Sequence, residues 1–410
     1  MNLNKRISLL LIAIFSVSSL YAQDPIDSKE FGGSDINTIQ SVVPFLTIAP
    51  DSRSGGMGDA GVATSPDMHS MHWNPAKYAF IDGDGGVGLS YSPWLRNLVN
   101  DINLAYLAGY YRVDDRQVIS MSLLYFSLGN ITFTDPYGNT IRNFNPNEFS
   151  IDAAYSRIFG DHFSLGVAFR YIYSNLTGGL TVGGGETKPG MSVAADVSTY
   201  YENDVELFGF NTRLAWGLNI SNIGTKMTYT DDEDPDFIPT NFRLGGSMRM
   251  DFDQYNSLTL AIDLNKLLVP TPPIYYDLND TLPSGAVVES SETYIKYGKD
   301  PNVGVPVGMV QSFYDAPGGF SEEMHEIAYS IGLEYWYSNQ FAVRAGYFHE
   351  HQSKGNRKFF TAGVGLKLNI FNLDFAYLIP TTQNHPLAKT LRFTIGFDFD
   401  SFRKLNRTDG

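Results

Sequence analysis

Long stretches of the chain alternate strictly between apolar residues and small or polar ones. From 391 to 399, the apolar residues Leu391, Phe393, Ile395, Phe397 and Phe399 are separated by Arg, Thr, Gly and Asp. The stretches 240–251, 254–266 and 360–370 repeat this pattern. Because successive side chains of a β-strand point to opposite faces, each stretch predicts a strand with one apolar face.

These stretches are too long and too numerous for an ordinary soluble sheet. Many of them reach ten residues, the length that crosses a bilayer at a tilt, whereas soluble strands average about five or six. The sequence therefore predicts an all-β fold, an antiparallel transmembrane β-barrel of about fourteen strands with an N-terminal plug segment in its lumen. The predicted strands lie near 87–92, 102–112, 116–128, 147–159, 161–175, 191–202, 208–221, 240–251, 254–266, 326–337, 340–350, 357–369, 371–379 and 390–399.

The connections between these stretches alternate between short and long. The short ones lie at 113–116, 160–161, 251–254, 338–339 and around 369–371, with a somewhat longer one at 202–208. The long ones cover 93–101, 129–146, 176–190, 222–239, 267–325, 351–356 and 380–389. Short periplasmic turns and long external loops characterise outer-membrane barrels, so 129–146, 222–239 and 267–325 are expected outside the cell.

Composition agrees with a barrel. Aromatic residues make up 14% of the chain, there are 39 glycines, and charged residues reach only 18%. After residue 22 no run of eighteen apolar residues remains, so no transmembrane helix is expected. The net charge of −15 argues against a nucleic-acid partner. The expected location is the cell outer membrane, where outer-membrane lipid surrounds a multi-pass barrel.

The N-terminus has the features of a secretory signal peptide. Lys5 and Arg6 precede the apolar run ISLLLIAIFSVSSL, and Ala22 offers a cleavage site. The predicted divisions are a signal peptide at 1–22, an N-terminal extension and plug at 23–86, and the barrel with long extracellular loops at 87–410. The chain has no cysteine, which excludes disulfides and thiolate metal sites.

The stretch SGGMGDAGVATS contains the letters of a dinucleotide-binding fingerprint, G-x-G-x-x-G, at Gly56, Gly58 and Gly61. That fingerprint requires a buried strand before it and a helix after it, within a βαβ unit. Pro44 and Pro50 disfavour such a strand, and no βαβ unit follows. The glycines fit a plug better, because they allow tight turns and close approach to a barrel wall.

A family resemblance supports that interpretation. The string AGVATSPDMHSMHWNPAKYAF resembles the N-terminal plug of FadL-family barrels, and Asn74-Pro75-Ala76 matches their Asn-Pro-Ala triplet. The longer string FLTIAPDSRSGGMGDAGVATSPD…WNPAKYAF, over about 45–80, resembles the PorV family of type IX secretion outer-membrane proteins. The predicted plug residues are Gly56, Gly58, Gly61, Trp73, Asn74 and Pro75.

The resemblance implies a function. PorV-like proteins are FadL-like barrels with no known catalytic triad that bind the C-terminal signal domain of secreted cargo. They shuttle this cargo from the type IX translocon barrel to the cell-surface attachment proteins. The alternatives are a FadL-type transporter of hydrophobic molecules, by analogy of fold alone, and a lipid-modifying enzyme. The inward faces rich in Gly, Thr and Arg count against the transporter, and the lack of a paired nucleophile and base counts against the enzyme.

A cargo shuttle needs contacts on the external rim. Two stretches offer large apolar residues there, SPWLRNLV at 92–99 and the loop 267–325. Aromatic side chains are frequent among binding hot spots, although they can equally form a membrane girdle or pack a loop on itself. The predicted partner-binding residues are Trp94, Leu95, Tyr275, Tyr276, Phe313, Tyr314 and Phe320.

Other patterns suggest no chemistry. The acidic run TDDEDPDF at 230–237 lacks the spacing of a calcium loop. His349 and His351 share a strand face, but a third metal ligand is not evident nearby. His69 and His72 fit packing inside the plug, and no serine lies in G-x-S-x-G. No enzyme activity, metal or cofactor is expected. Six arginines predicted to face the lumen should pair with acids or plug carbonyls, namely Arg170, Arg213, Arg243, Arg249, Arg344 and Arg392.

Overall fold

The computed structural model describes residues 36–96, 99, 101–134, 137–179, 181–182, 185–231, 234–278, 281–284, 286–288, 294–368, 370–382 and 386–399. The predicted signal peptide and residues 23–35 of the predicted extension lie outside the described residues.

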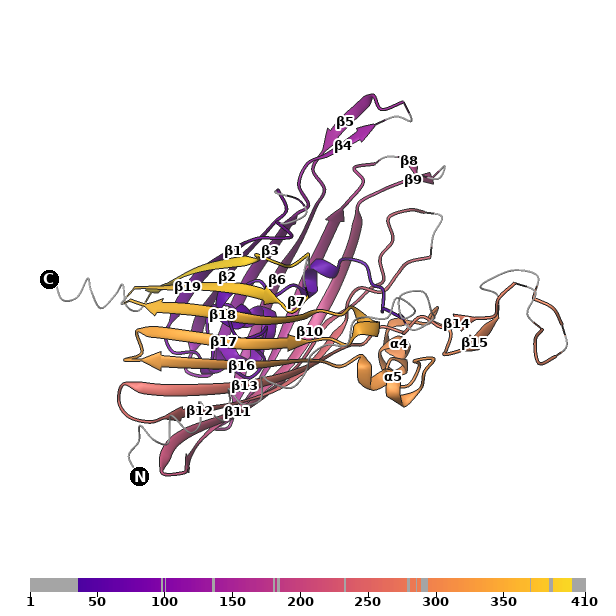
Figure 1. Ribbon diagram of the computed structural model, residues 1–410. Coiled ribbons are helices and arrows are strands. Elements are labelled where there is room, and N and C mark those ends of the chain that lie inside the picture. Colours follow the sequence, from indigo (N-terminus) through magenta and orange to yellow (C-terminus); the bar gives the residue numbers. More distant parts are fainter. Residues whose placement is uncertain are drawn as a thin grey trace. The chain divides into compact units, whose positions relative to one another are not determined.

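Fourteen antiparallel strands form a closed barrel, which confirms the predicted all-β barrel of about fourteen strands (Figure 1). Each strand pairs with the next one along the chain, and the first pairs with the last, so that Val87 lies opposite Phe397. Closure leaves no unpaired sheet edge for the hydrocarbon to meet. The strands are β1 (Gly85–Pro93), β2 (Asn103–Asp114), β3 (Gln117–Ser127), β6 (Asn147–Phe159), β7 (Phe163–Asn175), β10 (Gly190–Leu207), β11 (Phe210–Gly224), β12 (Asn241–Asp251), β13 (Asn256–Leu267), β16 (Ala328–Tyr337), β17 (Phe341–His349), β18 (Lys358–Lys367), β19 (Phe371–Pro380) and β20 (Leu391–Asp398).

The apolar faces of the strands point outward. In β3, Ile119 and Met121 are 47% and 62% exposed, whereas Val118 and Ser120, which alternate with them, are buried. Exposing these apolar side chains of the outer face to water would cost free energy, but they suit contact with lipid. The inner face takes small and polar residues. The alternation in the sequence therefore records which side of each strand faces the membrane.

The connections alternate as predicted, with one exception. The stretch 202–208 was predicted as a connection, and this is wrong, because β10 continues to Leu207 and pairs with β11 up to a turn at Phe208 and Gly209. Alternating acidic residues are unusual in strands. They are tolerated here because this hairpin extends beyond β7, whose pairing with β10 stops at Phe163.

Several long loops contain small elements of their own. Three two-stranded sheets lie in the loops, together with two short α-helices and a 3-10 helix. No helix in the described part of the chain is long and apolar enough to cross a membrane. The loop elements are β4 (Ile131–Thr134), β5 (Thr140–Phe144), β8 (Thr181–Val182), β9 (Gly185–Glu186), β14 (Ile274–Tyr275), β15 (Ile295–Tyr297), α4 (Val305–Gln311), α5 (Phe320–His325) and η4 (Gln352–Lys354).

The chain before β1 forms short helical turns. These are η2 (Pro44–Thr47), α2 (Ser52–Gly55), α3 (Ser70–Trp73) and η3 (Pro75–Phe80). We call residues 38–84 the N-terminal segment. Its turn η3 contacts β3, β6, β7 and β10, whereas α2 contacts β18, β19 and β20. The segment therefore touches strands from widely separated parts of the barrel.

Candidate functional site

The glycines of the fingerprint lie against other protein atoms. A Cβ on Gly61 would overlap the ring of Trp73, and one on Gly56 would lie 3.2 Å from the Cα of Gly363. Gly58 has a φ of +68°, a backbone conformation that side chains disfavour. From residue 36 to these glycines the elements are η2 and α2, so no strand of the kind that a dinucleotide site requires lies in that described stretch.

Backbone amides of this glycine stretch are bound by side chains of the barrel strands. The carboxylate oxygen Oδ2 of Asp263, in β13, accepts hydrogen bonds from the backbone N–H groups of Gly61 and Val62 at 2.6 and 2.9 Å. The hydroxyl of Thr361, in β18, accepts one from Gly58 at 2.8 Å. The glycine stretch of the N-terminal segment is therefore attached to two strands of the barrel wall, β13 and β18.

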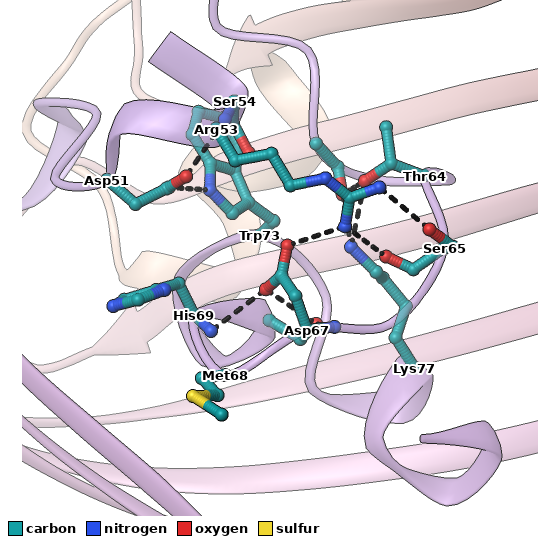
Figure 2. A network of polar contacts seen from close by, with 12 residues as sticks. Asp51, Arg53, Ser54, Thr64, Ser65, Asp67, Met68, His69, Trp73 and Lys77 are labelled. Atoms are coloured by element: carbon teal, nitrogen blue, oxygen red, sulfur yellow. Dashed lines mark hydrogen bonds and ion pairs between the residues drawn. The ribbon is translucent and has the colours of Figure 1, made fainter. Parts of the chain in front are cut away.

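The Trp-Asn-Pro stretch makes a second set of contacts. The indole N–H of Trp73 donates to Asp51 at 2.7 Å (Figure 2). The amide nitrogen of Asn74 donates to two backbone carbonyls, that of Val62 at 3.0 Å and that of Thr199 in β10 at 2.9 Å. All these groups are buried, so losing a partner would leave a polar atom without water to replace it.

Ion pairs also hold the segment. Figure 2 shows the guanidinium of Arg53 beside Asp67, at 2.9 Å, and Arg53 also binds Glu334 in β16 at 2.8 Å. Burial alone would raise the pKa of Asp67, but the positive charges of Lys77 and Arg53 lower it to about 2. Lys77 itself is fully buried and donates to the carbonyl of Gly61 at 2.8 Å.

The six predicted plug residues thus lie in one network of close packing and buried hydrogen bonds, with the hydroxyl of Ser156 bound to the carbonyl of Pro75 at 2.7 Å. That the segment seals the lumen stays a prediction. The sequence reasoning missed the strand residues Asp263 and Thr361. For Asp263 the sequence offered one signal, an acidic residue on the inward face of a strand whose other residues alternate between apolar and small or polar ones.

The inward arginines have the partners predicted for them. Arg170 pairs with Asp152 at 2.5 Å, Arg344 with Glu334 at 2.7 Å and Arg392 with Asp59 at 2.9 Å. Arg213 and Arg249 pair with acids near the barrel end that carries the short turns. Arg243 instead donates to the backbone carbonyl of His72 at 2.8 Å.

The predicted rim residues do not form one surface. Trp94 and Leu95 are partly buried and pack against the cluster that contains Phe348 and Phe359. Tyr275 and Tyr276 are also partly buried, and the ring of Tyr276 lies 5.2 Å from the Lys296 ammonium. Only Phe313, Tyr314 and Phe320 are well exposed, at 51%, 56% and 80%.

Two of the exposed aromatic residues, Phe313 and Phe320, belong to a larger apolar surface on and beside α4 and α5. We define the α4–α5 surface as Val307, Val310, Phe313, Phe320 and Met324, each about half exposed or more. Exposed apolar side chains on and beside two helices of one loop are typical of a protein-binding surface. The sequence analysis missed Val307, Val310 and Met324, because short helices inside a long loop leave only a weak periodic signal.

A cluster of charges holds α5 on the barrel. Lys266, at the end of β13, binds Glu323 at 3.0 Å and Glu326 at 2.5 Å. Lys354, in η4, binds Glu322 at 2.6 Å and Glu326 at 2.9 Å. Because these side chains are largely buried, the cluster fixes α5 in one position rather than leaving it on a passive loop.

The histidines do not assemble a metal site. The rings of His351 and His325 stack at 3.6 Å between centroids, and His349 stacks on Tyr329 at 4.6 Å. Among the described residues, no group of three or more His, Cys, Asp or Glu side chains could hold a metal ion. The acidic run at 230–237 lies partly outside those residues.

Comparison with known proteins gives a family match and several similar folds. The family model described as "Type IX secretion system protein PorV" matches residues 32–274. No curated protein matches the chain. Among solved structures, the toluene transporter TodX of Pseudomonas putida is similar, with 11% identity, a TM-score of 0.47, and coverage of 85% of this chain and 97% of that one.

Two further solved structures are similar to a comparable extent. The CymD monoaromatic hydrocarbon channel shares 12% identity, with a TM-score of 0.46 and coverage of 86% of this chain and 98% of that one. A FadL homologue of Pseudomonas aeruginosa shares 11% identity, with a TM-score of 0.43 and coverage of 89% and 100%.

Proposed function

The chain belongs to the PorV family of type IX secretion system proteins and is an outer-membrane β-barrel of that system, and we propose that it binds the C-terminal signal domains of secreted cargo. In this proposal it receives cargo from the type IX translocon barrel and passes it to the cell-surface attachment proteins. It performs this task by binding alone, without enzyme activity.

The observation that carries the proposal is the α4–α5 surface. Its apolar side chains are exposed at the barrel end that carries the long loops, where a folded cargo domain outside the membrane would be met. The charge cluster of Lys266 and Lys354 with the acids of α5 keeps this surface preformed. A preformed surface loses little conformational entropy on binding, which favours affinity.

The contacts of the N-terminal segment count against the alternative, a transporter of hydrophobic molecules. A transporter needs an open apolar path, but buried hydrogen bonds from Asp263, Thr361 and Thr199 cross the space between the segment and the strands. Moving the segment aside would break these bonds together, at a cost of about 1–3 kcal/mol for each buried group left unpaired.

The test is a triple substitution on the α4–α5 surface, Val310→Ser with Phe313→Ala and Phe320→Ala. Loss of two or more hot spots should weaken cargo binding by about 4 kcal/mol or more, without affecting insertion. The measurement is co-purification of a signal-domain cargo with the tagged barrel, together with secretion of that cargo.

The matched control changes exposed apolar residues on another long loop, Ile131→Ala with Tyr137→Ala and Ile141→Ala in the β4–β5 hairpin. These side chains are 41%, 91% and 59% exposed. Normal cargo capture by the α4–α5 variant would refute the proposed surface. If both variants capture cargo normally and the cells that carry the α4–α5 variant no longer grow on a long-chain fatty acid, the transporter would be favoured.

A further inference from the structure

A small cavity lies between the N-terminal segment and the inner wall, near the end of the barrel that carries the long loops. Its volume is about 110 Å³. Trp73 contributes one wall, Leu267 and Phe348 contribute apolar atoms, and Asn241, Arg243 and Asn265 contribute polar groups. The cavity is therefore apolar on one side and rich in hydrogen-bond donors on the other.

Arg243 is the unusual member of this lining. Its side chain is 5% exposed, yet no described carboxylate lies within 4.0 Å of its guanidinium. Its Nη1 donates to the carbonyl of His72, and its Cζ lies 5.0 Å from the centre of the Trp73 ring. Its Nε is buried without any hydrogen-bond partner among the described residues.

The other inward arginines show what is missing. Arg170, Arg344 and Arg392 are equally buried, and each binds at least one carboxylate. Burying an unpaired charge costs several kcal/mol, so buried charges in proteins are normally paired. Arg243 has the carbonyl and ring of His72 and the face of Trp73 as neighbours, which orient the guanidinium. The carboxylates of Asp263 and Asp196 attract its charge through space, but neither forms an ion pair with it within 4.0 Å.

Two amides stand beside this charge. Asn265 is the cross-strand partner of Arg243 in the β12–β13 pairing, so their side chains share the inner face. Asn241 precedes Arg243 by two residues on that same face. Neither amide makes a side-chain hydrogen bond to a described residue. A guanidinium N–H and two amide groups therefore converge on one small space, and all of them can donate.

The acids that also line the cavity have their own partners. Asp59 binds Arg392, and Glu326 binds Lys266 and Lys354. Glu350 binds Arg357 at 2.7 Å. Because these carboxylates are already neutralised, they do not supply the charge that Arg243 lacks.

We propose that Arg243, Asn241 and Asn265 bind one small monovalent anion, a halide or a short carboxylate, in this cavity. A site needs about 10–15 Å³ of cavity volume to hold one water, so a cavity of about 110 Å³ admits a small ion with its last waters. Charge-assisted hydrogen bonds from Arg243 give the site its preference for anions. Bound there, the anion joins β12, β13 and the N-terminal segment through the residues that surround it.

Iodide is the probe, because it quenches the fluorescence of a nearby indole. The full-length barrel in detergent would carry Trp94→Phe, Trp216→Phe and Trp336→Phe, so that Trp73 is the only emitter. Trp73 is 3% exposed, so a quencher reaches it only from inside. Iodide replaces gluconate at constant ionic strength. We expect saturable quenching that chloride or acetate relieves, and the better competitor distinguishes a halide site from a carboxylate site.

Arg243→Gln should weaken iodide binding by about tenfold or more. The matched control is Arg213→Gln, an inward arginine of the neighbouring strand that pairs with Asp204 near the other end of the barrel. It should leave iodide binding unchanged. Quenching that rises linearly with iodide to the same extent in Arg243→Gln would overturn the proposal, as would equal quenching by neutral acrylamide.

A second variant keeps the test decisive if Arg243→Gln does not insert. Asn265→Leu preserves the guanidinium but removes one amide, and it should weaken iodide binding by about threefold or more. Unchanged affinity in Asn265→Leu, together with no competition by chloride or acetate in the parent protein, would refute the site.

Discussion

Gly58 lies so close to Tyr347 that a Cβ on Gly58 would stand 2.6 Å from the backbone nitrogen of Tyr347. Real Cβ atoms do not approach backbone atoms so closely. The neighbouring atoms belong to the main chain of β17, so no rotamer change relieves the overlap. This contact joins the N-terminal segment to the barrel wall without any side chain between them.

Substituting Gly58→Val should therefore destabilise the folded barrel. Overpacking costs about 1–3 kcal/mol, and the positive φ of Gly58 adds backbone strain. The measurement is the temperature at which the compact band converts to the unfolded band on a gel. Gly304→Ala is the control, because a Cβ there meets open space. A Gly58→Val protein as heat-resistant as wild type would contradict the contact.

Asn74→Ala should also lower stability, for a different reason. It removes the donor to the carbonyls of Val62 and Thr199, of which the first is buried and the second partly buried. The expected loss is about 1–3 kcal/mol, seen as faster proteolysis of the N-terminal segment. Asn302→Ala, at an exposed loop position, serves as the control. Equal protease resistance in both variants would remove Asn74 from the set of plug residues.

The prediction that the segment seals the lumen can be tested on the unaltered protein. Proteoliposomes that contain the wild-type barrel should swell in a disaccharide solution no faster than empty liposomes. Gly58→Val should increase that rate if the segment is displaced. Rapid swelling with the wild-type barrel would show an open lumen and argue against a plug.

Asp315 makes the loop around α4 and α5 sensitive to pH. Burial, together with the nearby Glu323 and Glu326, raises its pKa to about 6, although the backbone N–H of Thr271 opposes this. A carboxyl whose pKa is higher in the folded than in the unfolded state stabilises the fold at low pH. That contribution is complete below about pH 4, the unfolded pKa, and is lost as the pH rises through 6.

Asp315→Asn should therefore protect the loop from proteolysis at pH 7.5 more than at pH 5. The measurement is the ratio of loop cleavage rates between variant and wild type at each pH, which cancels the pH dependence of the protease itself. Asp277→Asn, at an exposed position in the same loop, is the control. A ratio that does not change with pH would show that Asp315 does not titrate in this range.

The orientation of the barrel can be read with single cysteines, because the natural chain has none. Tyr137 in the β4–β5 loop is 91% exposed, and Phe208 at the tip of the β10–β11 hairpin is 81% exposed. On intact cells, an impermeant maleimide should label Tyr137→Cys but not Phe208→Cys. The opposite result would place the long loops in the periplasm and remove the surface that cargo is proposed to meet.

The sequence predicted the barrel because membrane strands repeat one simple rule along the chain. The alternation around Phe393 and Phe397 lies within one strand, so it can be recognised without knowing which strands pair with it. The prediction of a connection at 202–208 was wrong because acidic residues are typical of a loop. Only the pairing with β11 shows that they extend a strand here.

The site was harder to predict, because its partners are distant in the chain. Nothing near Asp263 indicates that Gly61 and Val62 will donate to it across 202 and 201 residues. Trp94 was predicted as an exposed anchor because it is a large apolar residue in a loop expected to be solvated, yet it packs against residues of β17 and β18. Local patterns report which face a side chain takes, but they do not report its partner.

The contacts of the N-terminal segment also constrain the order in which the molecule is assembled. The amide of Ser52 donates to the hydroxyl of Thr394 at 2.9 Å, across 342 positions of the chain. The N-terminal segment is synthesised before every strand, so its contacts are complete only after the last strand has been made. Contacts between such distant residues form slowly, and the seam between β1 and β20 has to close around a segment already in place. We expect closure of that seam to be the final event of folding, with the N-terminal segment serving as the template on which the ring is completed.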